Sequence, residues 1–229
     1  MELPLNNPVW HALVSGNKNL AYGNEKVKYF DSKVSPFVGL EENSADNFKI
    51  LANTLTTNKP VGFISDIELD TPKGWKLIRY VKCLQMVYNA EKRFDLGNNQ
   101  LQPLADVHIP QMLELTKLTK PGPFDERTID FGNYFGVFEA GQLVAMGGQR
   151  LHPKPYQEIS AICTHPDYLG KGYASQILKF NINRILNEEG IPFLHVRHDN
   201  HRAIQVYERL GFVTRTYLHF YFIQKEEMV

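Results

Sequence analysis

The chain has 229 residues, 43% hydrophobic and 22% charged, so it can bury a substantial core and is not intrinsically disordered. Its 25 Lys and Arg residues balance 25 Asp and Glu residues, which gives no basic excess to attract nucleic acid or an anionic membrane. No apolar run approaches the roughly 20 residues that cross a bilayer, and the N-terminus lacks the layout of a signal peptide. The two cysteines, Cys83 and Cys163, form no metal-ligand spacing or disulfide framework, so we expect a cytoplasmic protein.

Helix and strand signals alternate along the first half of the chain. Two segments begin with a helix-capping residue, and two later segments have the β-branched and aromatic content of strands. The predicted elements are helices that begin after Asn7 and Ser44 and strands at 61–67 and 75–88. We find no chemical motif in residues 1–95, and residues 95–99 have the composition of a linker.

The second half predicts a more regular alternation of strands and helices. The predicted elements are a helix at 109–118, strands at 134–138, 143–146 and 158–163, a helix from about 173 to Gly190, a strand at 191–196, a helix at 201–210 and a strand at 216–223. The segment 191–196 is a mostly apolar run, which is typical of a buried parallel strand.

Small residues gather at Gly170, Gly172 and Ala174, where a strand and a loop lead into a predicted helix. Glycine permits a tight turn and lets a ligand approach the backbone. The first amides of a helix have no partner within the helix, and with the helix dipole they suit an anion such as pyrophosphate. An ordinary glycine-rich turn is the alternative, because short glycine motifs often occur by chance. The P-loop and dinucleotide patterns do not fit, since Tyr173 and Ser175 stand where those patterns require other residues.

A second segment, at residues 200–212, completes a resemblance to a known family. The matching residues are Thr164-His165-Pro166, Leu169-Gly170-Lys171-Gly172-Tyr173-Ala174, Asn200, Ala203, Tyr207 and Gly211-Phe212. Together with the helix and strand between them, they resemble the GNAT superfamily of N-acetyltransferases over about residues 101–225. The segment 118–124 and the long N-terminal extension are similar in layout to relatives of glycine N-acyltransferase.

The resemblance implies a site for acetyl-coenzyme A as co-substrate. The loop that would bind the pyrophosphate through backbone amides comprises Leu169, Gly170, Lys171, Gly172, Tyr173 and Ala174. The backbone at Cys163 and Thr164 would pair with the pantetheine arm, and Asn200 would hold the pantetheine. The family usually has Arg or Gln at the position of Leu169, which has no charge to offer to phosphate, so Lys171 is the candidate to supply it.

The resemblance also implies that Tyr207 lies near the sulfur and protonates the departing thiolate. A phenol has an ordinary pKa of about 10, above the value of about 8.5 for a thiol, so it stays protonated at neutral pH. The alternative for Tyr207 is packing in the core on an amphipathic helix. Glu158, on the strand beside the expected acetyl site, is the candidate general base, although a Glu at a strand start is more often a solvated surface residue.

The sequence also contains residues that could form a metal centre or a cysteine nucleophile. His195, His198 and His201 are close in sequence, but they lie across a strand end, a loop and a helix start, so they need not converge on zinc. Cys163 lacks a sequence signature for activation, which favours a buried, inert thiol. We therefore expect no metal cofactor.

The predicted fold is α/β: a GNAT acyltransferase fold with a mixed central sheet flanked by helices at residues 96–229, and a smaller α/β domain at residues 1–95. As the resemblance implies, the expected activity is direct transfer of an acetyl group to the primary amine of a small-molecule or peptide acceptor, with no nucleic-acid or membrane partner. A transferase of longer acyl groups and a non-catalytic coenzyme A sensor are the alternatives. We expect the N-terminal half to form one wall of the acceptor pocket, because clefts between domains are frequent ligand sites.

Overall fold

The computed structural model describes residues 4–97 and 101–226. The helices are α1 (Pro8–Val14), α2 (Ala45–Thr54), α3 (Ile109–Thr119), α4 (Tyr173–Asn187) and α5 (His201–Leu210). The strands are β1 (Ala21–Gly23), β2 (Val27–Phe30), β3 (Val38–Leu40), β4 (Val61–Ser65), β5 (Trp75–Tyr88), β6 (Gln102–Pro103), β7 (Phe135–Glu139), β8 (Gln142–Gln149), β9 (Tyr156–Thr164), β10 (Ile191–Arg197) and β11 (Phe212–Lys225). Short 3₁₀ helices lie at Lys18–Leu20, Asp106–His108, Thr128–Phe131 and Pro166–Tyr168.

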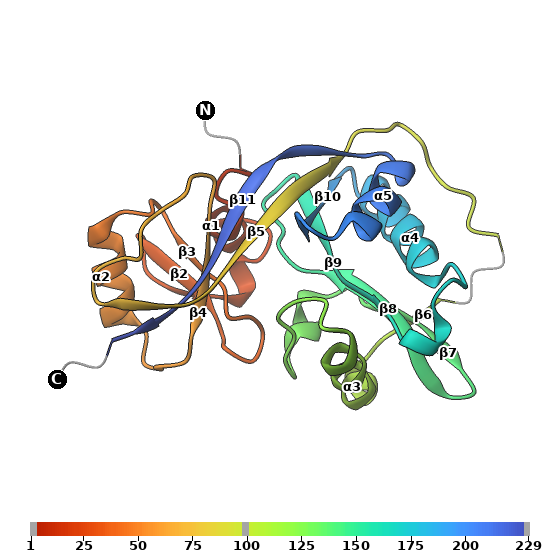
Figure 1. The fold of residues 1–229 in the computed structure, drawn as a ribbon, viewed down its shortest axis with the longest axis horizontal. Helices are drawn as coiled ribbons and strands as arrows, with labels where there is room; N and C mark the ends of the chain where they lie inside the picture. The colour runs from red at the N-terminus through yellow and green to blue at the C-terminus, as the bar shows by residue number, and fades with distance from the viewer. Residues whose placement is uncertain (1–3, 98–100, 227–229) are drawn as a thin grey trace.

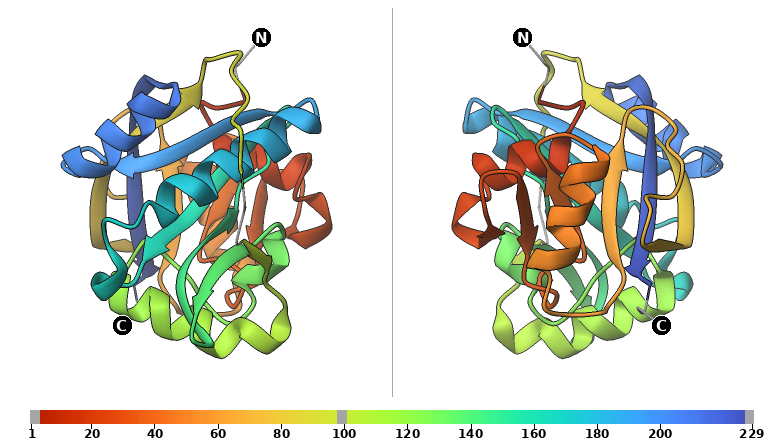
Figure 2. Two further views of the ribbon diagram at one scale, coloured as in Figure 1. Left: turned by 90° about the vertical axis from the view of Figure 1, so that its right-hand side faces the viewer. Right: turned by 90° about the vertical axis from the view of Figure 1, so that its left-hand side faces the viewer.

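Two lobes are joined by one large sheet (Figure 1). Within the described residues, that sheet has eight strands in the order β4-β11-β5-β10-β9-β8-β7-β6, and a separate sheet has the order β1-β2-β3. The long strands β5 and β11 form a twisted antiparallel ribbon that runs from one lobe into the other. Helices α4 and α5 lie on one side of β8 and β9, and α3 lies on the other (Figures 1 and 2). A mixed sheet flanked by helices confirms the predicted α/β fold class.

The two helices predicted near the N-terminus form, but their first residues act differently. The Ser44 hydroxyl accepts a hydrogen bond from the Asn47 amide at 3.3 Å and caps α2, as a serine before a helix should. Asn7 precedes α1, but its side chain donates to the Leu40 carbonyl at 2.8 Å and so ties the helix to β3. The face of α2 that carries Phe48 then packs in a cluster with strands β3, β4 and β11.

The strand pairing does not follow the predicted boundary between residues 1–95 and 96–229. Strand β5 comes from the first part of the chain, yet it lies between β10 and β11 and pairs with both. Strand β4 extends the same sheet by pairing with the far end of β11. A hydrophobic cluster also joins the two parts, since Leu5, Val9 and Phe37 pack with Phe193 and Phe220. Residues 61–88 therefore belong to the sheet of the C-terminal part.

Candidate active site

Strands β9 and β10 separate after a short parallel pairing. The paired positions run from Tyr156 opposite Ile191 to Glu158 opposite Phe193. Beyond Glu158, β9 continues to Thr164 and stays paired only with β8, while β10 continues to Arg197 paired only with β5. In the described part of the chain, the facing edges of residues 159–164 and 194–197 thus have no ladder partner. We call the space between these edges the strand opening; its narrow end is at Glu158.

A bulge bends β9 where it borders the strand opening. The pairing with β8 shifts between Met146, opposite Cys163, and Gly148, opposite Ser160, so β9 holds one extra residue there. Ala161 in this bulge has φ 55°, a conformation that costs a non-glycine residue free energy and that clusters at functional sites. The bulge turns the backbone of β9 out of its ladder with β8, so its amide groups can face a ligand.

The N-terminus of α4 lies at the wide end of the opening, directly after β9 and a 3₁₀ turn. Gly170 has φ 83°, and Gly172, the residue before the helix, has φ 82°. A Cβ atom added at either glycine would meet no atom within 4 Å, so the space beside both is open. The first amides of α4 have no partners within the helix, and the space beside the two glycines is open, so the phosphate-binding role of this loop stays a prediction.

The other residues predicted for coenzyme binding surround this turn. Leu169 is 50% exposed, and the Lys171 ammonium lies 4.6 Å from the centre of the Tyr168 ring. The Tyr173 hydroxyl donates to a carboxylate oxygen of Glu139. Ala174 follows in the first turn of α4.

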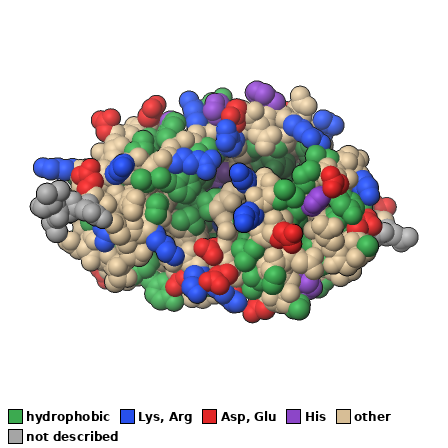
Figure 3. Space-filling model, turned by 60° about the horizontal axis from the view of Figure 1, so that its bottom comes forward, with side chains coloured by type: hydrophobic (Ala, Val, Ile, Leu, Met, Phe, Trp, Pro, Cys, Tyr) green, Lys and Arg blue, Asp and Glu red, His purple; other side chains and the backbone are tan. Residues whose placement is uncertain are grey.

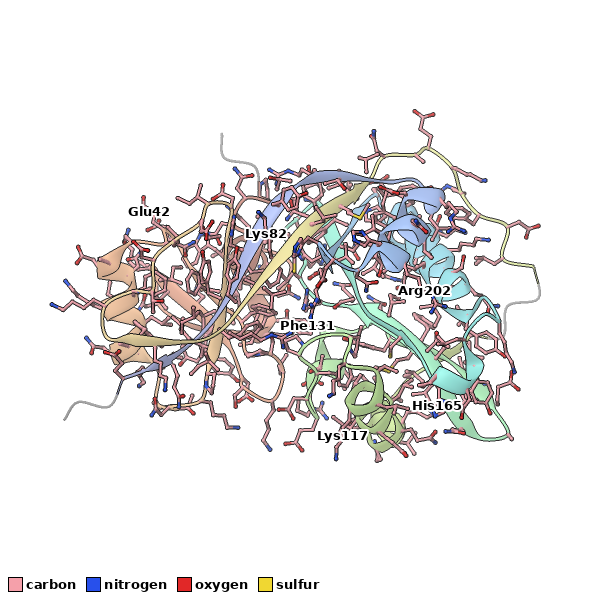
Figure 4. The ribbon with its side chains drawn as sticks, viewed as in Figure 1. Glu42, Lys82, Lys117, Phe131, His165 and Arg202 are labelled. Atoms are coloured by element: carbon pink, nitrogen blue, oxygen red, sulfur yellow. The ribbon has the colours of Figure 1, made fainter. Side chains whose placement is uncertain are left out.

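Asn200 and Thr164, two residues predicted to contact pantetheine, differ in the hydrogen bonds of their side chains. The Asn200 side-chain oxygen accepts from the Ala203 amide at 3.2 Å, so Asn200 caps α5. Thr164 ends β9, and its hydroxyl is buried without a hydrogen-bond partner among the described residues. A buried polar group of this kind is costly unless something satisfies it, so Thr164 and the unpaired edge of β9 fit a polar arm such as pantetheine. Figure 4 shows the neighbouring His165 near the start of α4, and Arg202 at the start of α5.

Tyr207 lies on α5, on the same side of the sheet as α4. It is half-buried and packs against the cluster that includes Ile159 of β9 and Val196 of β10, so it stands beside the strand opening. Its ring meets Phe212 edge to face at 6.1 Å. Burial raises the pKa of Tyr207 to about 12, and no hydrogen bond to its hydroxyl is formed by the described residues. The hydroxyl is therefore protonated and available.

Glu158 is not a surface residue: it is 0% exposed and lies on the opposite side of the sheet, facing the N-terminal lobe. Arg150 clamps its carboxylate with two hydrogen bonds, at 2.9 and 2.5 Å, and His195 Nδ1 lies 2.7 Å from the same group. The Leu151 amide adds a bond at 3.2 Å. Burial alone would raise the pKa of Glu158, but Arg150 and His195 together lower it to about 2. The carboxylate is thus ionised and held in one orientation.

The three histidines weighed as a metal site have separate surroundings. His195 is buried beside Glu158, His198 Nδ1 lies 3.1 Å from the Lys82 carbonyl, and His201 is exposed at the start of α5. Across residues 4–97 and 101–226, no group of three or more His, Cys, Asp or Glu side chains is placed to hold a metal ion. Cys83 and Cys163 are both free and buried, and burial raises the pKa of each thiol to about 11, which disfavours a nucleophilic thiolate.

A cavity of about 580 Å³ lies between the N-terminal lobe and the loop at 123–128. Its walls carry aromatic and apolar side chains together with a few charged and hydroxyl groups; examples are Tyr22, Tyr29, Phe30, Phe124, Lys59 and Asp125. Phe37 and Tyr134 connect this wall to the Glu158 cluster: Phe37 lies under the Arg150 guanidinium at 5.1 Å, and Tyr134 contacts Phe124 at 5.8 Å. The underside of the molecule is hollowed near its middle, with hydrophobic side chains inside and Lys and Arg around it (Figure 3).

Sequence reasoning missed Arg150, Gln85 and the bulge at Ala161. Arg150 and Gln85 are ordinary polar residues in the sequence, and they reach Glu158 and His195 only because the four strands β5, β10, β9 and β8 lie side by side. The alternation of β9 gives no sign that it contains an extra residue. None of the helices in the described ranges is both long and apolar enough to cross a membrane.

Comparison with known proteins agrees with this geometry. The family model for FR47-like proteins matches residues 134–223, which include β7 to β11 and the strand opening. Mycothiol acetyltransferases from Streptomyces coelicolor and Streptomyces scabiei are each 30% identical over 113 residues, or 48% of this chain. That match covers 36% of the length of either relative.

Solved structures extend the likeness to the whole chain. An acetyltransferase of the GNAT family from Novosphingobium aromaticivorans superposes with a TM-score of 0.90 and 28% identity, over 99% of this chain and 100% of that one. A GCN5-related N-acetyltransferase from Kribbella flavida, 9% identical, has a TM-score of 0.60 over 96% of both chains and shares the fold. The strand opening, the helix that begins beside it and these likenesses together support a GNAT-superfamily N-acetyltransferase.

Proposed function

We propose that the chain transfers an acetyl group from acetyl-coenzyme A to the primary amine of an acceptor by direct attack. The observation that carries the proposal is the strand opening, whose unpaired backbone edges end at the free amides of α4. An extended polar arm can pair with such an edge as a further strand would, while a pyrophosphate meets the helix N-terminus. The buried hydroxyl of Thr164 supports this placement because it lacks a partner among the described residues.

The proposed reaction forms one bond and breaks one. The amine nitrogen attacks the thioester carbonyl carbon, and the oxyanion is stabilised by backbone amides at the bulge of β9. The carbon–sulfur bond then breaks, and Tyr207 gives its proton to the departing thiolate. With a pKa of about 12, Tyr207 holds that proton at neutral pH until the thiolate forms. Solvent returns a proton to the tyrosine after coenzyme A leaves.

The general-base role of Glu158 stays a prediction. The low pKa of its carboxylate affects which role Glu158 could have in the reaction. A carboxylate with a pKa of about 2 takes a proton from an ammonium group weakly. We therefore infer that Glu158 acts by attracting and orienting the amine or a water molecule at the narrow end of the opening, while solvent removes the proton. Its position, at the last paired residue before the opening, supports such a role.

The acceptor is proposed to enter from the side of the N-terminal lobe. The cavity of about 580 Å³ has the size and the mostly apolar lining of a small-molecule site, and it lies at the junction of the two parts of the chain. One layer of side chains, which includes Phe37 and Tyr134, stands between this cavity and the Glu158 cluster. The expectation that the N-terminal half forms an acceptor wall is in accord with this arrangement.

A screen of amines with detection of free thiol tests the proposal. The panel contains amino acids, polyamines, short peptides and an amine related to mycothiol, because two relatives are mycothiol acetyltransferases. Release of coenzyme A that depends on one amine class supports acetyl transfer. Faster release from a longer acyl-coenzyme A would favour the longer donor instead. Tight binding of acetyl-coenzyme A with no release for any amine would favour the non-catalytic sensor.

Binding is measured separately, by calorimetry and by thermal unfolding. A ligand that binds only the native state adds about 2.7 kcal/mol of stability at a hundredfold excess over its dissociation constant, so acetyl-coenzyme A should raise the Tm. Absence of both a heat signal and a Tm shift at millimolar ligand would contradict the proposal.

A further inference from the structure

A row of polar side chains crosses the sheet beneath the N-terminal lobe. The row runs over neighbouring strands from β11 to the end of β8, and its members are Arg215, Gln85, His195, Glu158 and Arg150. The joining distances are 2.7 Å from Arg215 to Gln85, 3.2 Å from Gln85 to His195, and 2.7 Å from His195 to Glu158. Gln85 and Glu158 are both 0% exposed. Arg215 is half-buried, so the row runs from an end near the surface to a centre that water does not reach.

Arg215 joins the row at a point where β11 is irregular. In the pairing with β5, Thr214 stands opposite Met86 and Thr216 stands opposite Gln85, so Arg215 is an extra residue in a bulge. A bulge re-aims a side chain relative to the regular alternation of a strand. Here it brings the Arg215 guanidinium to the oxygen of Gln85.

From Arg215 to Glu158 the hydrogen bonds of the row all donate toward the carboxylate, and Arg150 donates to it from the other end. Arg215 can only donate, so the Gln85 oxygen accepts from it, and the Gln85 amide nitrogen is left to donate to His195 Nε2. The same nitrogen donates to the Leu5 carbonyl at 3.0 Å, which excludes the flipped amide. His195 Nε2 must then be an acceptor, so its proton is on Nδ1 and is donated to Glu158. Hydrogen bonds aligned in this way strengthen one another.

The Glu158 carboxylate is contacted by groups from two neighbouring strands, and one of them belongs to the aligned hydrogen bonds. Arg150 and the Leu151 amide approach the carboxylate from the end of β8, and His195 approaches from β10. Two further titratable groups, Tyr134 and Cys83, are close enough to feel the charge of Glu158. Burial and that charge raise the pKa of both groups. Of these partners, only His195 can carry its proton on either of two nitrogens. Gln85 and Arg215 therefore decide which nitrogen of His195 faces Glu158 with a proton.

We propose that Arg215 is a positioning residue of the acyl-transfer site, which acts through Gln85 and His195 to fix the orientation of Glu158 at the narrow end of the strand opening. The inference rests on the proposed function, since it assigns Glu158 to that reaction. A plain structural role for Arg215 is the rival, because its other terminal nitrogen donates to the Asn6 side chain and so anchors the N-terminal segment. The two roles predict different effects of mutation.

The tautomer of His195 gives a direct test in the protein without ligand. The ¹⁵N NMR signals of His195 in the wild type should show a proton on Nδ1 and none on Nε2. In Arg215→Met the Gln85 oxygen loses its donor and only the Leu5 carbonyl and His195 still hold the amide, so its bond to His195 should loosen and part of the His195 population should carry a proton on Nε2. Arg215→Lys, which keeps a charged donor, should restore the wild-type signals. A wild-type ring protonated on Nε2, or a ring unchanged in Arg215→Met, would overturn the proposal.

Kinetics of the same variants distinguish positioning from anchoring. Misplacement of a catalytic group can cost up to about a hundredfold in rate, so kcat of Arg215→Met should fall by roughly tenfold to a hundredfold with KM for acetyl-coenzyme A unchanged. Asn6→Ala removes the anchor but leaves the row, and it should keep the wild-type kcat and His195 signals. Arg209→Met, an exposed arginine on α5, is the matched control. A loss of kcat in Asn6→Ala equal to that in Arg215→Met would show that anchoring is the role. Failure of the wild type to release coenzyme A with any amine would contradict the proposed function, whereas the NMR result would still report on the row.

Discussion

Glu158 shows that the sequence alone does not decide whether a glutamate is exposed to solvent or buried in an ion pair. In the sequence it is a carboxylate at the start of a strand, where a solvated side chain is common. In the fold it is fully buried, paired with Arg150 and His195, and ionised. A buried ion pair adds little net stability compared with an apolar pair, but removing one partner leaves the other charge uncompensated. This cluster is therefore a sensitive point of the molecule.

Glu158→Gln should lower the free energy of unfolding by about 3–5 kcal/mol, because Arg150 would be left buried without a counter-charge. Urea unfolding measures the change, with the exposed Glu189→Gln as the control. The pH dependence has a definite sign: the folded pKa of about 2 lies below the ordinary 4.5. The stability from Glu158 is complete above about 4.5 and is lost as pH falls toward 2. A Glu158→Gln protein as stable as the wild type would contradict this account.

Tyr207→Phe should lower kcat by about 100-fold to 10,000-fold while acetyl-coenzyme A binding stays near the wild-type value. The phenyl ring keeps the contact with Phe212, so the change removes the hydroxyl and little else. Steady-state rates with one confirmed acceptor and calorimetry with acetyl-coenzyme A are the measurements. If Tyr207 served only for packing, turnover per folded molecule would be unchanged, and the acid role would be excluded.

At the scale of elements, the turn into α4 shows why glycine stands at two positions of the loop. Gly170 and Gly172 both have positive φ, and the space beside both is open. The need for glycine here therefore comes from the backbone conformation and not from a crowded neighbour. The open space remains for a ligand at the first amides of the helix.

Gly172→Glu should abolish binding of acetyl-coenzyme A, because the side chain would enter the phosphate space and its charge would repel phosphate. Gly74→Glu is the matched control: Gly74 also has φ 82° and open space beside it, but it lies in the turn before β5. Both variants carry the same backbone strain, so calorimetry should separate the loss of the site from the loss of stability. Equal affinities in the two variants would place the phosphate elsewhere.

For the whole molecule, the ribbon of β5 and β11 decides how the two parts of the chain depend on each other. β11 pairs with β5 along nearly its whole length, and β10 pairs with residues 83–87 of β5 on the other edge. Removing β5 would expose the edges of β10 and β11 and would take Cys83, Met86 and Val87 out of the hydrophobic clusters. The lobes are thus folded around a shared strand.

A fragment of residues 96–229 should fail to fold on its own, although it contains the motifs of the family. The fragment lacks β4 and β5, so β11 loses both of its partners. Circular dichroism, NMR dispersion and acetyl-coenzyme A binding of the fragment are the measurements, with a chain that starts at residue 4 as the control. A dispersed spectrum and tight binding by the fragment would show that the C-terminal part is independent.

The sequence by itself determined most of the longer helices and strands and the glycine turn before α4. Periodicity and caps predicted α2 from Ser44, β5 at residues 75–88 and α5 at residues 201–210, because these signals are local and act over a few residues. The Gly170 and Gly172 turn was predictable for the same reason, since a backbone with positive φ favours glycine.

Only the tertiary structure decided how those helices and strands pair and which of their side chains meet. The short pairing of β9 with β10, which creates the strand opening, depends on two strands 30 or so residues apart and on neighbours at both edges. The same is true of the row from Arg215 to Arg150, in which a bulge sets one end and strand register sets the rest. Side chains distant in sequence meet through register, and register comes from the packing of the whole sheet. For that reason the sequence could name Glu158 but not its partners.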